Sequence, residues 1–170
     1  MLRRLLAAVA AVALVALLLF TFGGEAPGLI APGEPAPEIK AGQWVGGERP
    51  DLAGKIVVVD VFATWCKPCI KTTPALIDVY EEFQQHGIVF VSLTGEDGNA
   101  RPEVEAFREQ MNVPWVIGLD AGETLAQIGV PAIPLLVVIG PDGKVISVGG
   151  DDRSLRNVLS QAVAYQRQTS

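Results

Sequence analysis

Residues 59–69 read VDVFATWCKPC and contain both cysteines of the chain, Cys66 and Cys69. The stretch continues the apolar run of residues 56–59, in which every side chain is β-branched, as is typical of a strand buried on both faces. After the cysteines, apolar residues recur at helical spacing as far as Gly87, a residue suited to end a helix. We therefore predict that the two cysteines lie where a buried strand gives way to a helix.

The spacing of the two cysteines suits a redox pair. With Cys66 at the start of the helix and Cys69 one turn inside it, the two sulfurs can come within bonding reach. The free N–H groups and the positive dipole end of the helix stabilise a thiolate on Cys66, and Lys67 adds a positive charge beside it. Pro68 fits the first turn, where its missing N–H would have no partner. We predict Cys66 as the nucleophile and Cys69 as the resolving thiol.

Other uses of a cysteine pair require particular ligands or a longer loop between the cysteines. A structural zinc site takes four cysteine or histidine ligands, whereas the chain has two cysteines and one histidine, so no metal site is expected. Covalent haem attachment needs histidine after the second cysteine, where Ile70 stands. A passive disulfide in an oxidising compartment stays open as an alternative, although so short a loop gives little stabilisation.

The rest of the chain alternates between patterns of strands and helices. Further strands are predicted at residues 88–93, 115–117, 135–139 and 144–148, the last two joined by a turn. Helices are predicted after Pro102, around Leu125 and Ile128, and at residues 155–163. Residues 39–55 suggest a short strand or hairpin at the edge of the domain. This order predicts an α/β fold with a mixed central sheet flanked by helices.

The start of the chain has the pattern of a membrane segment. Residues 5–22 are apolar except for Thr21 and as a helix would be about 27 Å long, close to the thickness of a bilayer core. The run is longer than the hydrophobic region of a cleaved signal peptide and no clear Ala-x-Ala site follows, which favours an uncleaved signal-anchor over a cleaved one. Because Arg3 and Arg4 precede the run, the rest of the chain is expected on the extracytoplasmic, periplasmic side of the cytoplasmic membrane.

Three segments are expected along the chain: a signal-anchor at residues 1–22, a flexible Gly/Pro-rich linker at residues 23–37, and one domain at residues 38–170. The net charge is −6, and without Arg3 and Arg4 the chain has 11 basic and 19 acidic residues. Such an excess of acid argues against nucleic acid as a partner. No cofactor is expected.

The motif at residues 59–69 resembles the active-site strand and turn of thioredoxins. Pro74 stands where a proline kinks the thioredoxin active-site helix, and Ile133-Pro134, just before a strand, resembles the cis-proline site of that family. The N-terminal anchor and a helix–strand insertion at about residues 95–118 narrow the resemblance to TlpA-like membrane-anchored thioredoxins, over about residues 35–165. The resemblance implies a thioredoxin fold with that insertion and a thiol–disulfide oxidoreductase activity.

The resemblance also implies roles for residues around the cysteines. Asp60 matches the buried acid of thioredoxins, and burial would raise its pKa and suit it to take a proton from Cys69. A cis bond at Pro134 would turn the backbone of Ile133 towards Cys66, where it could pair with an extended substrate. Trp65 is expected to offer a surface to substrate. The alternatives are a hydrogen-bonded core aspartate, a trans proline and a tryptophan that only packs.

Some positions depart from the pattern of the resembling family. Thr72 stands where reductive TlpA-like proteins often have glutamate, and Leu135 replaces the threonine common after the cis-proline. Asp60 itself is more typical of general thioredoxins. These departures weaken an assignment to cytochrome c maturation. His86 is expected only to sit at a helix C-terminus, where the dipole favours a partly charged imidazole.

The function implied by the resemblance is reduction of disulfides in protein substrates outside the membrane, with electrons supplied by a membrane protein. A protein-thiol oxidase of the same fold is the nearest alternative, because the potentials of such pairs span about −270 to −120 mV. A peroxidase of the peroxiredoxin type would carry threonine three residues before its reactive cysteine, where Ala63 stands. A tethered binding module without a redox cycle is the alternative from another class.

Overall fold

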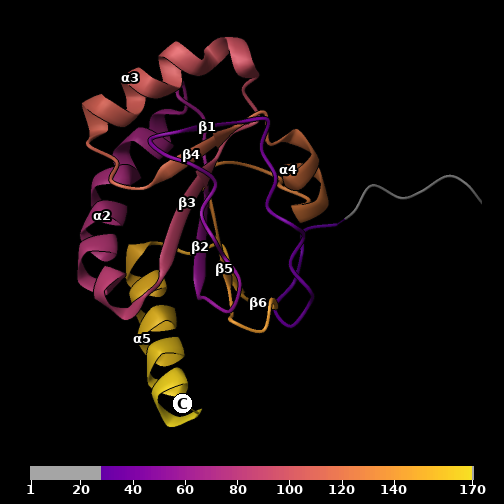
Figure 1. The fold of residues 1–170 in the computed structure, drawn as a ribbon, viewed down its shortest axis with the longest axis vertical. Coiled ribbons are helices and arrows are strands. Elements are labelled where there is room, and N and C mark those ends of the chain that lie inside the picture. The colour runs from indigo at the N-terminus through magenta and orange to yellow at the C-terminus, as the bar shows by residue number, and fades with distance from the viewer. Residues whose placement is uncertain (1–27, 170) are drawn as a thin grey trace, which may run out of the picture.

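The computed structural model describes residues 28–169 (Figure 1). Its strands are β1 (Gln43–Val45), β2 (Val57–Val61), β3 (Val89–Leu93), β4 (Val116–Leu119), β5 (Leu135–Ile139) and β6 (Val145–Val148). Its helices are α2 (Lys67–Phe83), α3 (Arg101–Met111), α4 (Gly122–Ile128) and α5 (Asp152–Thr169), with 3₁₀ turns η1 (Gln84–His86) and η2 (Gly98–Ala100). The predicted signal-anchor at residues 1–22 lies outside the described residues. Within residues 28–169, every helix is too short or too polar to cross a membrane.

The strands form one mixed sheet in the order β1-β4-β3-β2-β5-β6. β2 pairs in parallel with β3, and β3 with β4, whereas β1, β5 and β6 join antiparallel to their neighbours. β2 lies at the centre, and because side chains alternate along a strand, Val58 and Asp60 face one side while Val57, Val59 and Val61 face the other. The predicted α/β fold with a mixed sheet is confirmed.

Helices cover both faces of this sheet (Figure 1). α2, α3 and α5 pack on the face of Val58, with Leu76, Phe107 and Leu159 among the residues that they bury there. α4 packs on the opposite face through Ile128. Each fully buried aliphatic side chain contributes about 1.5–3 kcal/mol relative to an exposed one, so the cluster that contains Leu76 holds α2 on its face of the sheet.

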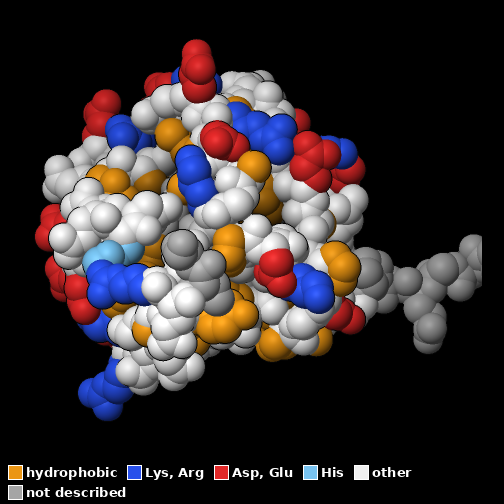
Figure 2. Space-filling model, turned by 60° about the horizontal axis from the view of Figure 1, so that its bottom comes forward, with side chains coloured by type: hydrophobic (Ala, Val, Ile, Leu, Met, Phe, Trp, Pro, Cys, Tyr) orange, Lys and Arg blue, Asp and Glu red, His pale blue; other side chains and the backbone are white. Residues whose placement is uncertain are grey.

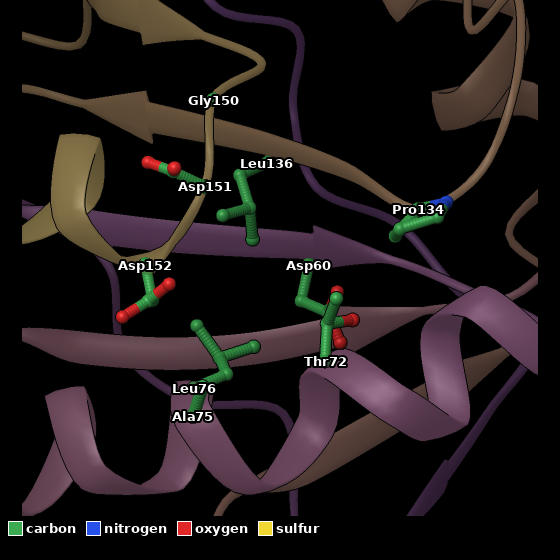
Figure 3. Close-up of a pocket in the computed structure, with 9 residues that line it drawn as sticks. All are labelled: Asp60, Thr72, Ala75, Leu76, Pro134, Leu136, Gly150, Asp151 and Asp152. Atoms are coloured by element: carbon green, nitrogen blue, oxygen red, sulfur yellow. The ribbon is translucent and has the colours of Figure 1, made fainter.

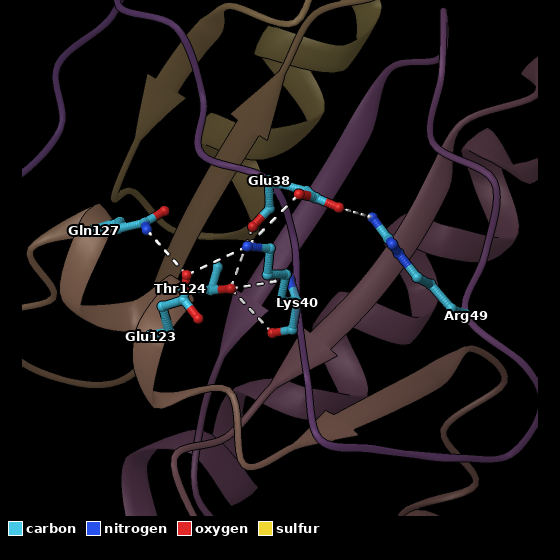
Figure 4. Close-up of polar contacts among 6 residues, drawn as sticks. All are labelled: Glu38, Lys40, Arg49, Glu123, Thr124 and Gln127. Carbon is cyan, nitrogen blue, oxygen red and sulfur yellow. Dashed lines mark hydrogen bonds and ion pairs between the residues drawn. The ribbon is translucent and has the colours of Figure 1, made fainter.

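The segment before β1 is fastened to α4 by polar contacts (Figure 4). The hydroxyl of Thr124, which is 1% exposed, accepts a hydrogen bond from the N–H of Lys40 at 2.9 Å and donates to the carbonyl oxygen of the same residue at 3.0 Å. At the surface, Lys40 pairs with Glu123 at 3.3 Å. The buried hydroxyl therefore takes up both backbone groups of a residue that has no strand partner here.

Residues 28–37, which the sequence pattern places in a linker, lie against the domain. Ile30 is buried, and its N–H donates to the carbonyl oxygen of Ile128 at 2.9 Å. The N–H of Gly33 donates to the carbonyl oxygen of Val145 at 2.8 Å. The packed domain therefore begins before residue 38. Ile30 packs in the same cluster as Ile128 of α4, a contact that no local sequence pattern predicts.

Element ends differ from the predictions by a few residues. The helix predicted after the cysteines is α2 followed by η1, and Gly87 ends it, as expected, with a left-handed backbone at φ 72°. Residues 39–55 supply β1, which pairs with β4 at the edge of the sheet. Trp115 precedes β4 instead of beginning it.

Candidate active site

Cys66 and Cys69 form a disulfide at the start of α2, with their Cα atoms 5.2 Å apart. Cys66 is the N-cap of the helix, with an extended backbone at φ −77° and ψ 100°. Its Sγ accepts a hydrogen bond from the N–H of Cys69 at 3.2 Å. Because this N–H has no partner inside the helix, it directs positive charge at the sulfur of Cys66, as the helix-start argument predicts.

The side chains around the disulfide are more exposed than the disulfide itself. Cys66 and Cys69 are 4% and 2% exposed, whereas Trp65 is 72% exposed. Lys67 and Pro68 are also exposed, and Pro68 stands in the first turn of α2. Trp65 lines a shallow groove together with apolar residues of α2 and α3, Ile70, Ala106, Phe107 and Met111. Thr64, Glu103 and Gln110 also line this groove, which is therefore apolar only in part.

A carboxylate behind the active-site turn holds it to the end of β3. Glu96 accepts hydrogen bonds from both the N–H and the hydroxyl of Thr64, the first at 2.9 Å. It also accepts one from the hydroxyl of Thr94 at 2.8 Å. Sequence reasoning missed Glu96, because an acidic residue after a buried strand was the only local signal for it.

Asp60 faces α2 from the centre of the sheet. Its carboxylate accepts a hydrogen bond from the hydroxyl of Ser92, its register partner on β3, at 2.8 Å. Burial raises the pKa of Asp60 to about 6, and the bond from Ser92 opposes that rise. The expected raised pKa is thus found, and its cause is the one the sequence argument gave.

A cavity of about 90 Å³ adjoins Asp60, and Figure 3 shows Asp60 on the sheet and Leu76 on α2 among the residues that line it. Thr72 of α2 and Pro134 also line it, so Asp60, Thr72 and Pro134 share one cavity. The hydroxyl of Thr72 donates to the carbonyl oxygen of Cys69 at 3.0 Å. The cavity is large enough to admit water beside Thr72, Ala75 and Leu76 of α2.

The Ile133–Pro134 peptide bond is cis, as the resemblance implies. Pro134 is exposed, and Ile133 is partly buried against the clusters on both faces of the sheet. Both residues immediately precede β5, and Leu135 is buried in that strand.

His86 lies away from the redox pair, at the other end of α2, where η1 ends. Its Nδ1 is 3.4 Å from Nη2 of Arg167 near the end of α5, and Figure 2 shows this imidazole beside a basic side chain. Within residues 28–169, no group of three or more histidine, cysteine or acidic side chains is arranged to hold a metal ion.

Comparison with known proteins assigns the family. A family profile described as the AhpC/TSA family matches residues 32–148. The chain belongs to the AhpC/TSA family. Among curated proteins, the thiol-disulfide oxidoreductase ResA of Bacillus subtilis (strain 168) is 31% identical over 102 residues, which cover 59% of this chain and 56% of that protein. ResA of Bacillus thuringiensis subsp. konkukian (strain 97-27) is 31% identical over 100 residues, covering 58% and 57%. The chain thus matches little more than half the length of these relatives.

Solved structures agree with the fold. The thioredoxin domain of a thiol-disulfide oxidoreductase from Bacteroides vulgatus is 24% identical with a TM-score of 0.70, covering 79% of this chain and 99% of that one. A thiol:disulfide interchange protein from Bacteroides sp. is 25% identical with a TM-score of 0.69, covering 79% and 91%. The predicted thioredoxin fold and the resemblance to TlpA-like thiol–disulfide oxidoreductases are confirmed.

Proposed function

We propose that this protein is a thiol–disulfide oxidoreductase that reduces disulfides of protein substrates through Cys66 and Cys69. The observation that carries the proposal is the disulfide at the N-terminus of α2, with the N–H of Cys69 directed at the sulfur of Cys66. That arrangement stabilises a thiolate on Cys66 when the pair is reduced. The names of the similar proteins support the same chemistry.

The reaction proceeds in two exchanges. In the first, the Cys66 thiolate attacks one sulfur of a substrate disulfide, that bond breaks, and the other substrate sulfur leaves as a thiolate that takes up a proton. In the second, the Cys69 thiolate attacks Cys66, which releases the second substrate sulfur and forms the Cys66–Cys69 disulfide. Two electrons pass from protein to substrate. Lys67 adds positive charge beside the attacking thiolate, and Pro68 fits the first turn of the helix, where its missing N–H would have no partner.

Asp60 is the proposed acceptor of the proton that Cys69 loses before the second exchange. Its pKa of about 6 keeps it mostly ionised at neutral pH yet able to bind a proton, as a general base requires. The cavity beside it reaches Thr72, one turn from Cys69, so water there offers a path for the proton.

Trp65, Ile133 and Pro134 are the proposed substrate-binding residues. Trp65 offers exposed apolar area next to the disulfide, and Ile133 and Pro134 stand at the entry to β5, where an extended chain can pair with backbone groups. A substrate held on both sides would present its own disulfide to Cys66.

We further propose that residues 1–22 anchor the protein in the cytoplasmic membrane, with the domain on the extracytoplasmic, periplasmic side and a membrane protein as its electron donor. The apolar run at residues 5–22 and the preceding Arg3 and Arg4 support this orientation. Alkaline carbonate washing of membranes tests it, because an anchored chain stays in the pellet. Release of a shortened chain into the supernatant would point to a cleaved signal peptide.

The reduction potential of the pair tests the direction of the reaction. A value below about −220 mV supports a reductase, since such a dithiol gives electrons to most labile disulfides. A value above about −150 mV supports an oxidase. A pair that fails to cycle supports the non-catalytic binding module, and peroxide consumption by the reduced protein would support a peroxidase.

A further inference from the structure

Three side chains behind the redox pair form a hydrogen-bonded chain. The indole N–H of Trp115 donates to the hydroxyl oxygen of Ser92 at 2.8 Å, and that hydroxyl donates to a carboxylate oxygen of Asp60 at 2.8 Å. Trp115 and Ser92 are 5% and 2% exposed. We propose that Trp115 and Ser92 are positioning residues that orient Asp60 and favour its ionised form, and so govern how readily it accepts a proton from Cys69. This inference rests on the proposed function of Asp60.

The chain of bonds has only one direction when Asp60 is ionised. An indole N–H can only donate, and an ionised carboxylate can only accept. The hydroxyl of Ser92 must therefore accept from Trp115 and donate to Asp60. A hydrogen bond to a charged acceptor is stronger than one to a neutral acceptor, and the bond from Trp115 polarises the hydroxyl further. The two hydrogen bonds, from Trp115 to Ser92 and from Ser92 to Asp60, therefore stabilise ionised Asp60 more than neutral Asp60.

Separate elements hold each member in place. The rings of Tyr80 and Phe90 each lie 5.3 Å from that of Trp115, centroid to centroid. The carbonyl oxygen of Trp115 accepts a hydrogen bond from Nε of Arg108 on α3 at 3.2 Å. Since Ser92 and Asp60 are register partners on adjacent strands, the sheet sets the distance between them. The bonds thus form without any side chain having to rearrange.

The other groups around Asp60 oppose its ionisation or are neutral. Asp152, the first residue of α5, and Asp151 just before it line the same cavity (Figure 3). Each already has a partner: Asp151 accepts from the N–H of Ser154 at 2.8 Å, and Asp152 pairs with Arg156 at 2.7 Å. The lining residues from α2 and β5 are uncharged, and in the reduced protein α2 adds the Cys69 thiol near this end. No basic side chain lines the cavity within residues 28–169. Ser92 is the hydrogen-bond donor that offsets the burial of Asp60.

The experiment is an NMR titration of the full chain in detergent micelles. We expect the indole N–H resonance of Trp115 to shift with pH, with the same midpoint as the carboxyl carbon of Asp60. Asp60→Asn should remove that shift. Ser92→Ala should raise the Asp60 midpoint by about one pH unit, the size expected for a hydrogen bond to a charged group. Trp115→Phe should raise it by less.

Trp44→Phe is the matched control, because Trp44 packs on the opposite face of the sheet, and it should leave the midpoint unchanged. The proposal is overturned if the Trp115 resonance does not titrate, or if Ser92→Ala leaves the Asp60 midpoint where it is in the wild type.

A rate measurement separates this inference from the proposed function. Ser92→Ala should slow release of substrate from the mixed disulfide about fivefold at pH 6 and about twofold at pH 7, with no effect at pH 9, if its midpoint rises by about one unit. A shifted midpoint with unchanged rates would overturn the catalytic part of the inference together with the role of Asp60. A wild type that exchanges no disulfides would overturn the proposed function alone, while the titration still decides whether Trp115 and Ser92 act on Asp60.

Discussion

The buried carboxylate of Asp60 lowers the free energy of unfolding at neutral pH. The pKa is about 6 in the folded state against an ordinary value of 3.8, because burial disfavours the charge. Between these values the folded state binds more protons than the unfolded state, so the free energy of unfolding falls as pH rises through this window. Above pH 6 the cost is fully present, on the order of 2–3 kcal/mol.

Asp60→Asn should therefore raise the free energy of unfolding at pH 8 by about 2 kcal/mol and leave it nearly unchanged at pH 4. The amide oxygen can still accept the hydrogen bond from Ser92, so the variant removes the charge and keeps the contact. Urea denaturation at the two pH values measures the difference. An equal gain at both would show that the buried charge is not its source.

Candidate site residues could be selected from the sequence where a local motif or the family resemblance marks them. Cys66, Cys69 and Asp60 stand at fixed positions along one strand and one helix start, so local pattern and resemblance were enough to select them. Ser92 and Trp115 could not be predicted in the same way, because their contacts with Asp60 depend on strand register and on the path of the chain before β4.

The carboxylate of Glu96 holds the turn at Thr64, just before the cysteines, in position. Glu96→Gln should lower the free energy of unfolding by about 1–3 kcal/mol, because an amide cannot accept both bonds from Thr64 without turning its NH₂ group towards a donor. Disulfide exchange should also slow, since the turn carries Cys66. Chemical denaturation and an insulin reduction assay check the two effects. Glu81→Gln on the exposed side of α2 is the control, and equal losses in both variants would refute the role of Glu96.

Removing the exposed side chain beside the disulfide should weaken the binding of protein substrates and leave reaction with small disulfides unchanged. Trp65→Ala should raise the KM for a protein disulfide several-fold and leave the free energy of unfolding within about 0.5 kcal/mol, because the side chain is 72% exposed. The rate with a small aromatic disulfide should hardly change. Ile146→Ala, an exposed apolar position on β6, serves as control. A KM that does not change for the protein substrate would contradict the proposed binding surface.

Elements were predicted best where a regular pattern ran into a clear end. α2 and the following turn η1 together extend to Gly87, as the apolar period predicts, and β5 matches the predicted residues 135–139. The segment at residues 28–37 could not be placed from sequence, because its bonds go to α4 and β6 and its Gly/Pro-rich composition has no period. β1 was expected only as a short edge element, since three residues pair with distant β4.

At the scale of the molecule, the candidate site residues come from segments far apart in the chain, and two of them, Asp60 and Pro134, line one cavity. Asp60 comes from β2, the cysteines from the start of α2, and Pro134 from the approach to β5. Charged side chains of both signs are scattered over the face shown in Figure 2. The fold class followed from the order of elements, whereas the cavity beside Asp60 follows only from their packing.

The most direct test of the account is to identify the cysteine that attacks a substrate. The reduced Cys69→Ser variant is mixed with a disulfide-containing protein, and the mixed disulfide is mapped by mass spectrometry. The account predicts a stable adduct through Cys66, because the resolving thiol is missing, and no adduct with the Cys66→Ser variant. An adduct through Cys69 in the Cys66→Ser variant, or none in the Cys69→Ser variant, would contradict it.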